Sequence, residues 1–181
     1  AAGIPVVIAG HDTQCALFGA GGGPTLPVLS SGTWEILMAR STPIHLEGLD
    51  PAAGITIEFD ARPGLCNPGM RWIASGILEW LGGLLYSDCG GAERYEKMTG
   101  EASLLPPGSE GVGMLPGLFA SSGLRGVYSG LFPGSTRAHL YRAALEALAF
   151  RARESLTRLE EWGGFRAGAV ICAGGGSKNH L

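Results

Sequence analysis

The apolar and polar positions of this chain alternate in blocks that predict strands and helices in turn. Residues 6–9 form a continuous apolar run, which is typical of a strand buried on both faces. Residues 27–38 contain two apolar stretches separated by polar residues around Gly32. We expect a strand, a tight turn that pivots at Gly32 and a second strand, because glycine tolerates the positive φ that such turns require.

Two further strands are expected. Residues 55–60 alternate strictly, with Ile55, Ile57 and Phe59 against Thr56, Glu58 and Asp60, which predicts a half-exposed strand. Residues 169–172 are apolar and lead into a glycine-rich turn, as a buried strand does. Polar turns therefore follow strands at several points of an α/β chain, and ligands in such folds collect at the carboxyl ends of strands.

Two long helices separate these strands. A broad apolar stripe predicts a helix over residues 70–86. The longest helix is expected over residues 136–162, where one face is apolar and two glycines follow. We expect Trp34, Trp72 and Trp80 in the core, with Trp34 the best placed of the three to meet a ligand.

Composition narrows the class of protein. The length of 181 residues suits one domain with a real core, and 31 residues are glycine. This glycine content is well above the average of about 7%. Many tight turns and close backbone contacts are therefore expected, either in phosphate-binding loops or in a merely loop-rich domain. The net charge of -3, without any cluster of Lys and Arg, argues against a nucleic-acid surface. No apolar run reaches the roughly 18 residues that span a membrane, and no basic segment opens a signal peptide.

The cysteines indicate the compartment. Cys15, Cys66, Cys89 and Cys172 are widely spaced and form no C-x-x-C pair. We therefore expect neither a structural zinc site nor a disulfide framework. Scattered, reduced thiols point to a cytoplasmic protein.

Asp12 is the first candidate for chemistry. It follows the apolar run of residues 6–9, and a carboxylate at the end of a strand can take a proton from an alcohol or help to hold Mg²⁺ beside phosphates. It can also be the N-cap of a short helix over residues 15–18, and the two roles are compatible. Its neighbour His11 is either a structural histidine or a donor to a substrate hydroxyl.

Two glycine-containing turns are candidates for binding phosphates. In Ser31-Gly32-Thr33, backbone N–H groups and the Thr33 hydroxyl can face phosphate oxygens, although the same pattern suits any hairpin. The second turn contains Gly174, Gly175, Gly176 and Ser177. It is either a nucleotide-binding turn or a close-packed crossover, and it lacks the G-x-G-x-x-G pattern of a dinucleotide fold.

Longer motifs resemble the C-terminal domain of the FGGY carbohydrate kinases. The second signature of that family is matched by Gly126-x-Tyr128-x-Gly130-Leu131, seven residues, and then His139-Leu140-x-x-Ala143-Ala144-Leu145-Glu146. Four further segments look like the branch of the family that phosphorylates L-fuculose. They are the Gly-His-Asp-Thr start, the Ser-Ser-Gly-Thr-Trp-Glu turn, Asn67-Pro68-Gly69-Met70 and the Gly-Gly-Gly-Ser end.

This resemblance implies a ribonuclease-H-like domain of the actin and hexokinase type, with a mixed sheet flanked by helices. It also implies transfer of the γ-phosphoryl group of ATP to a sugar hydroxyl, with Mg²⁺. Asp12 stands where the family has its catalytic base and would help to place Mg²⁺, while His11 and Thr13 would face the sugar. Gly32 and Thr33 stand where the family contacts ATP phosphates, and the turn at residues 174–177 matches the adenosine motif.

The resemblance further implies a partner domain. Residues 1–181 would form a C-terminal domain, truncated after its last strand and inactive without the N-terminal domain of the same protein. Sugar and ATP are the expected partners, without nucleic acid or membrane, and apolar surface left by the N-terminal domain could drive homo-oligomerisation. The alternatives are a kinase for L-rhamnulose, D-xylulose or glycerol, or a non-catalytic nucleotide-binding module on the same scaffold.

Overall fold

The computed structural model describes residues 3–5, 10–44, 54–115 and 126–181. Its centre is a five-stranded sheet made of β1 (Val28–Ser31), β2 (Trp34–Met38), β3 (Ile55–Phe59), β4 (Cys66–Ile73) and β7 (Ile171–Ala173). The strand order is β3-β4-β2-β1-β7. Strand β7 runs parallel to β1 and the other neighbours are antiparallel, so the sheet is mixed, as expected.

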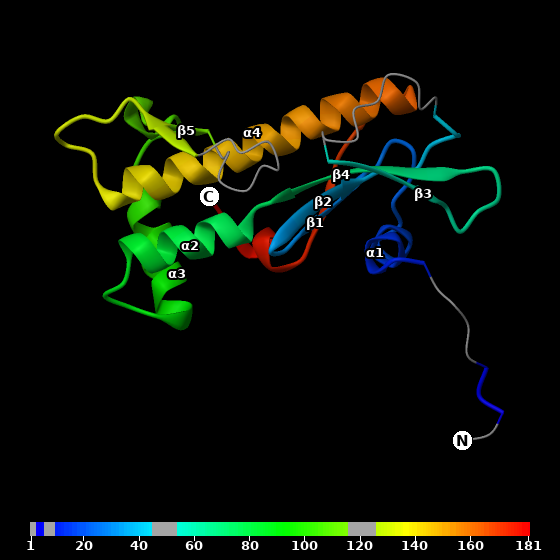
Figure 1. Ribbon diagram of the computed structural model, residues 1–181, viewed down its shortest axis with the longest axis horizontal. Coiled ribbons are helices and arrows are strands. Elements are labelled where there is room, and N and C mark those ends of the chain that lie inside the picture. Colours follow the sequence, from blue (N-terminus) through cyan, green and yellow to red (C-terminus); the bar gives the residue numbers. More distant parts are fainter. Residues whose placement is uncertain (1–2, 6–9, 45–53, 116–125) are drawn as a thin grey trace.

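Helices cover both faces of this sheet (Figure 1). The helices are α1 (Asp12–Gly19), α2 (Ser75–Leu85), α3 (Gly91–Ser103) and α4 (Arg137–Gly163), with short 3-10 turns at Ser109–Gly111 and Gly175–Lys178. A small hairpin of β5 (Gly113–Leu115) and β6 (Val127–Ser129) packs against α4. Helix α4 lies along one face of the sheet and α1 lies on the opposite face.

The main core lies between α4 and the sheet. Buried side chains of β2 and β4, including Leu37 and Met70, form one cluster with Leu148 and Leu159 of α4. The buried positions of α4 follow the helical period expected for residues 136–162, and the helix ends at Gly164 in the left-handed conformation (φ 62). The prediction of this helix is therefore confirmed.

The helix predicted from residue 70 is wrong for its first turn. Residues 70–73 belong to β4, which pairs with β2 on one side and with β3 on the other. Helix α2 begins at Ser75, after the Ala74 N–H donates to the carbonyl of Thr33 at 3.1 Å. A short apolar run suits a strand or a helix equally well, and here the two strand partners decide.

The half-exposed strand predicted over residues 55–60 forms as β3. Its apolar side chains are not the covered ones: Phe59 is 93% exposed and Ile57 is exposed as well, whereas the Thr56 hydroxyl is buried. Alternation indicates that the two faces of a strand differ, but the packing of the whole sheet decides which face is covered.

Three other side chains are more exposed than predicted. Trp72 is buried as expected, but Trp34 of β2 and Trp80 of α2 are both exposed. Cys172 of β7 is exposed too, and β7 is an edge strand of the described sheet. The apolar run at residues 6–9 lies outside the described residues. Within the described ranges, no helix is long and apolar enough to cross a membrane.

Candidate functional site

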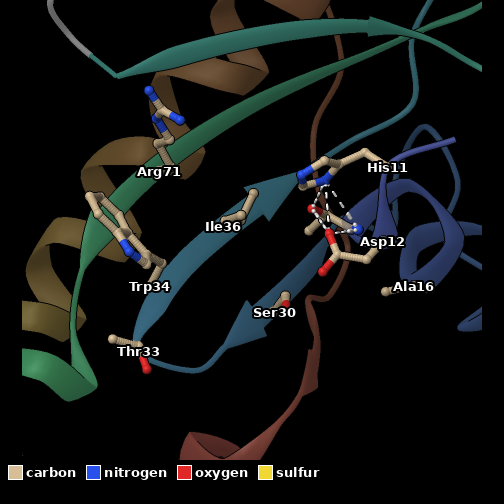
Figure 2. Close-up of a pocket in the computed structure, with 9 residues that line it drawn as sticks. His11, Asp12, Ala16, Ser30, Thr33, Trp34, Ile36 and Arg71 are labelled. Carbon is tan, nitrogen blue, oxygen red and sulfur yellow. Dashed lines mark hydrogen bonds and ion pairs between the residues drawn. The ribbon is translucent and has the colours of Figure 1, made fainter.

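An open pocket of about 560 Å³ lies between the start of α1 and the strands β1, β2 and β4 of the sheet (Figure 2). His11 and Asp12 form one side of it, and Thr33, Trp34 and Arg71 form the other. Thr13 also lines the pocket. The pocket therefore brings the predicted carboxylate together with the predicted hairpin turn.

Asp12 presents its carboxylate to solvent at the first turn of α1, where its side chain is 92% exposed. Oδ1 accepts the backbone N–H of Thr13 at 2.8 Å and lies 2.9 Å from Nδ1 of His11. Oδ2 has no hydrogen-bond partner among the described residues. This oxygen lies beside a helix N-terminus, which favours negative charge, and it is available to accept a proton from a ligand.

The N-cap of α1 is His11, so the prediction that Asp12 caps the helix is wrong. Nδ1 of His11 accepts the backbone N–H of Thr13 at 3.4 Å and lies 2.6 Å from Thr13 Oγ1. The side chain of Gln14 in turn accepts the backbone N–H of His11 at 3.0 Å. His11 and Gln14 form the capping box, and Asp12 uses only Oδ1 on the Thr13 N–H, which leaves its Oδ2 available.

Helix α1 is held on the sheet by apolar packing and by Gln14. Leu17 forms a buried cluster with Val28 and Met38. Nε2 of Gln14 donates to the carbonyl of Phe59 at 2.7 Å. The position of Asp12 is thus fixed by the sheet rather than by its own side chain.

A buried ion pair stabilises the sheet next to α1. Nε of Arg40 lies 2.6 Å from Oδ2 of Asp60, and the two side chains are only 6% and 2% exposed. The same Asp60 oxygen accepts Nδ2 of Asn67 at 2.7 Å, and Arg40 also donates to the carbonyl of Gly22 just after α1. Burial raises the pKa of Asp60, but the hydrogen bonds from Arg40 and Asn67 outweigh it and hold the pKa below its usual value.

The floor of the pocket is a row of side chains across three strands. Ser30, Ile36 and Arg71 are direct neighbours in the register of β1, β2 and β4. The sequence predicted none of these three as site residues, because strand register was needed to align them. Trp34 lines the pocket and is 49% exposed, so its indole is accessible from the pocket.

The β1–β2 turn is hydrogen-bonded to the start of α2. The carbonyls of Gly32 and Thr33 accept the N–H groups of Ser75 and Ala74 at 3.3 and 3.1 Å. Gly32 does not have the positive φ that was expected, and a Cβ there would meet its nearest neighbour, the carbonyl of Trp34, at an ordinary 3.7 Å. The turn itself therefore does not require glycine at position 32.

The second glycine turn packs against Ser31, at the end of β1. Gly174 has φ 98, and a Cβ there would collide with the carbonyl oxygen of Ser31. A Cβ on Gly176 would collide with the Ser31 hydroxyl, whereas Gly175 has open space. Ser177 Oγ donates to the carbonyl of Gly174 at 2.7 Å and closes the turn. Close packing thus accounts for two of the glycines, and none of these four residues lines the pocket.

Glu35 lies on the opposite face of the sheet from the pocket. Its Oε1 accepts the Ser31 hydroxyl at 2.8 Å and its Oε2 accepts the Trp72 indole N–H at 2.7 Å. Burial raises the pKa of the Glu35 carboxyl, and the two hydrogen bonds only partly offset this effect. The sequence offered no signal for this residue beyond its place in the Ser-Ser-Gly-Thr-Trp-Glu segment.

Comparison with known proteins identifies the family. Residues 28–181 match the C-terminal domain of the FGGY family of carbohydrate kinases, and the chain belongs to this family. It is 47% identical over 180 residues to L-fuculokinase of Escherichia coli K12, an alignment that covers 99% of this chain and 37% of the relative. L-fuculokinase of Haemophilus influenzae is 42% identical over 179 residues, covering 98% and 38% of the two chains.

The fold comparison agrees. The crystal structure of xylulose kinase from Rhodospirillum rubrum superposes with a TM-score of 0.84 at 24% identity, covering 95% of this chain and 34% of that one. The actin/hexokinase-like α/β fold that the sequence predicted is therefore confirmed. The chain spans little more than a third of the length of the curated relatives that it matches.

Proposed function

We propose that this chain is the nucleotide-binding C-terminal part of an ATP-dependent kinase that transfers the γ-phosphoryl group to a hydroxyl of L-fuculose. The observation that carries the proposal is the exposed carboxylate of Asp12 in the same pocket as Thr33. The 47% identity with a protein named L-fuculokinase supports the choice of sugar.

In this proposal, Asp12 accepts the proton of the sugar hydroxyl as the phosphoryl group is transferred, and His11 and Thr13 contact the sugar. Gly32 and the Thr33 hydroxyl contact the phosphates, and the turn of Gly174, Gly175, Gly176 and Ser177 holds the adenosine. Phosphoryl transfer asks a protein mainly for positioning and charge stabilisation, which a rigid sheet with turns at its edge can supply.

Asp12 also suits Mg²⁺, because this ion is commonly held by one or two carboxylates together with substrate phosphates and water. No group of three or more His, Cys, Asp or Glu side chains gathers among the described residues, so the phosphates of ATP would complete the coordination. When bound, Mg²⁺ offsets negative charge on the phosphates. A cytoplasmic location belongs to the same proposal, since the four cysteines are free thiols and ATP is available there.

The experiment is an ADP-release assay on the full-length protein with L-fuculose, L-rhamnulose, D-xylulose and glycerol. We expect the highest kcat/KM with L-fuculose. Residues 1–181 alone are expected to release no ADP with any sugar, because the proposed cleft needs an N-terminal domain.

The outcomes separate the alternatives. A higher kcat/KM with another sugar would change the substrate but keep the kinase. ADP binding by calorimetry without turnover of any sugar would replace the enzyme with a nucleotide-binding module. Turnover by residues 1–181 alone would contradict the requirement for a second domain.

A further inference from the structure

The carboxylate of Glu35 is an unusual group to find between the sheet and α4. Among the described residues no Lys, Arg or His lies within ion-pair distance of it, and its only hydrogen-bond donors there are Ser31 and Trp72. Glu35 is half-buried, and withdrawing a carboxylate from water without a cation costs folding free energy that an apolar side chain in the same space would not cost. Stability of the core therefore does not explain Glu35.

Glu35, Ser31 and Trp72 form a row across three strands, on the face away from the pocket. Ser31 pairs with Glu35 in the β1–β2 register, and Glu35 pairs with Trp72 in the β2–β4 register. Both carboxylate oxygens are used, one for each donor, at 2.8 and 2.7 Å. The Ser31 hydroxyl is thereby held in one orientation by a charged acceptor, which makes a stronger hydrogen bond than a neutral one.

Ser31 is also the residue on which the second glycine turn rests. Its carbonyl lies where a Cβ of Gly174 would point, and its hydroxyl lies where a Cβ of Gly176 would point. Ser31 also directly precedes Gly32 of the β1–β2 turn in the sequence. One serine therefore contacts both turns, and Glu35 fixes the side chain of that serine.

We propose that Glu35 is a positioning residue that, through Ser31, holds the β1–β2 turn and the glycine turn of residues 174–177 in fixed relation to each other. Glu35 does not touch the pocket, since it lies on the other face of the sheet. This inference rests on the proposed function in one respect: the two turns are the ones assigned there to ATP. Glu35 should therefore affect the binding of ATP and not the binding of the sugar.

The test uses Glu35→Leu, Glu35→Gln, Ser31→Ala and the double variant Ser31→Ala/Glu35→Leu in the full-length protein. Leucine removes both hydrogen bonds at similar size. Glutamine keeps two, because its carbonyl can accept from Trp72 while its amide donates to the Ser31 hydroxyl. Glu154→Gln, which removes an exposed carboxylate of α4, is the matched control and should behave as the unsubstituted protein.

Two measurements are made on each variant: amide hydrogen exchange of residues 174–178 without nucleotide, and steady-state kinetics with each substrate varied. We expect Glu35→Leu and Ser31→Ala to speed exchange in this segment and to raise the KM for ATP about tenfold, with the KM for sugar within about twofold. Glu35→Gln should fall between them and the unsubstituted protein. The double variant should be no worse than the more severe single one, because both changes break the same connection.

A purely structural role gives a different pattern: a lower kcat from fewer folded molecules, unchanged KM values and faster exchange spread over the sheet. That pattern, or additive effects in the double variant, would overturn the inference. Should Glu35→Leu fail to fold, Ser31→Ala and Glu35→Gln decide the question. If the unsubstituted protein proves not to be a kinase, the proposed function fails, and the exchange of residues 174–178 still decides whether Glu35 holds this turn.

Discussion

The side chain of Gln14 accepts the backbone N–H of His11 at 3.0 Å, and this contact fixes the residue directly before Asp12. Because Nε2 of Gln14 also donates to the carbonyl of Phe59, the start of α1 is connected to the edge strand β3. The backbone next to Asp12 is thus held by Gln14, a residue that does not line the pocket.

Gln14→Ala should lower kcat about ten- to a hundredfold with little change in the KM for ATP, since small misplacements of a reacting group are costly. Gln14→Glu is the matched comparison. It retains an acceptor for the His11 N–H but loses the donor to Phe59, so it should be less damaging than alanine. Equal kcat values for the three proteins, measured at saturating ATP and sugar, would show that Gln14 does not orient Asp12.

Asp12→Asn should lower kcat by about 10² to 10⁴-fold, the usual contribution of a general base, and leave the KM for ATP nearly unchanged. The substitution should not unfold the protein, because the side chain is 92% exposed. Steady-state kinetics and a thermal melt of the same preparation check both statements. Near-normal turnover would exclude Asp12 as the base.

Glu35→Gln should change stability in a pH-dependent manner. Burial raises the pKa of Glu35 in the folded protein above 4.5, so the contribution of this group to stability is fully present below that value and is lost as the pH rises through the folded pKa. We compare the free energy of unfolding of the glutamine variant with that of the unsubstituted protein at each pH. This difference should favour the variant more at about pH 7 than at about pH 4. Urea unfolding at the two pH values measures this difference, and a difference of the opposite sign would contradict the raised pKa.

Asp60→Ala should destabilise the fold by about 3–5 kcal/mol, because it leaves the guanidinium of Arg40 buried without its counter-ion. Asp88→Ala removes a surface carboxylate paired with Lys97 and Arg137 and should destabilise the fold far less, because solvent screens exposed ion pairs. Chemical denaturation of both variants provides the comparison. If the two variants lose similar free energies of unfolding, the buried Arg40–Asp60 pair contributes no more to stability than the surface pair.

Much of the fold follows from local patterns. The period of α4, its end at Gly164 and the β1–β2 hairpin were all predictable, because each depends on neighbours within a few turns of the chain. Residues 70–73 were not, since their assignment as a strand depends on pairing with β2 and β3. The exposure of Phe59 depends likewise on which face of the sheet is covered.

The site divides in the same way. Asp12 and Thr33 could be selected because each stands at a recognisable break in an apolar pattern, and the structure brings both to one pocket. Arg71 and Ser30 could not, because only the register of three strands makes them neighbours of Ile36. Glu35 remained hidden for a further reason: a charged residue within a strand is ordinarily expected on the exposed side.

The indole of Trp34 gives this pocket a spectroscopic reporter of its own. Half exposed beside the cavity, it is surrounded by water that a bound molecule must displace, and such displacement moves tryptophan fluorescence to shorter wavelengths. Trp72 is shielded by the sheet and α4, and Trp80 and Trp162 do not line the pocket, so these three tryptophans add a constant background. Occupancy of the pocket can therefore be followed optically, without a dye and without turnover.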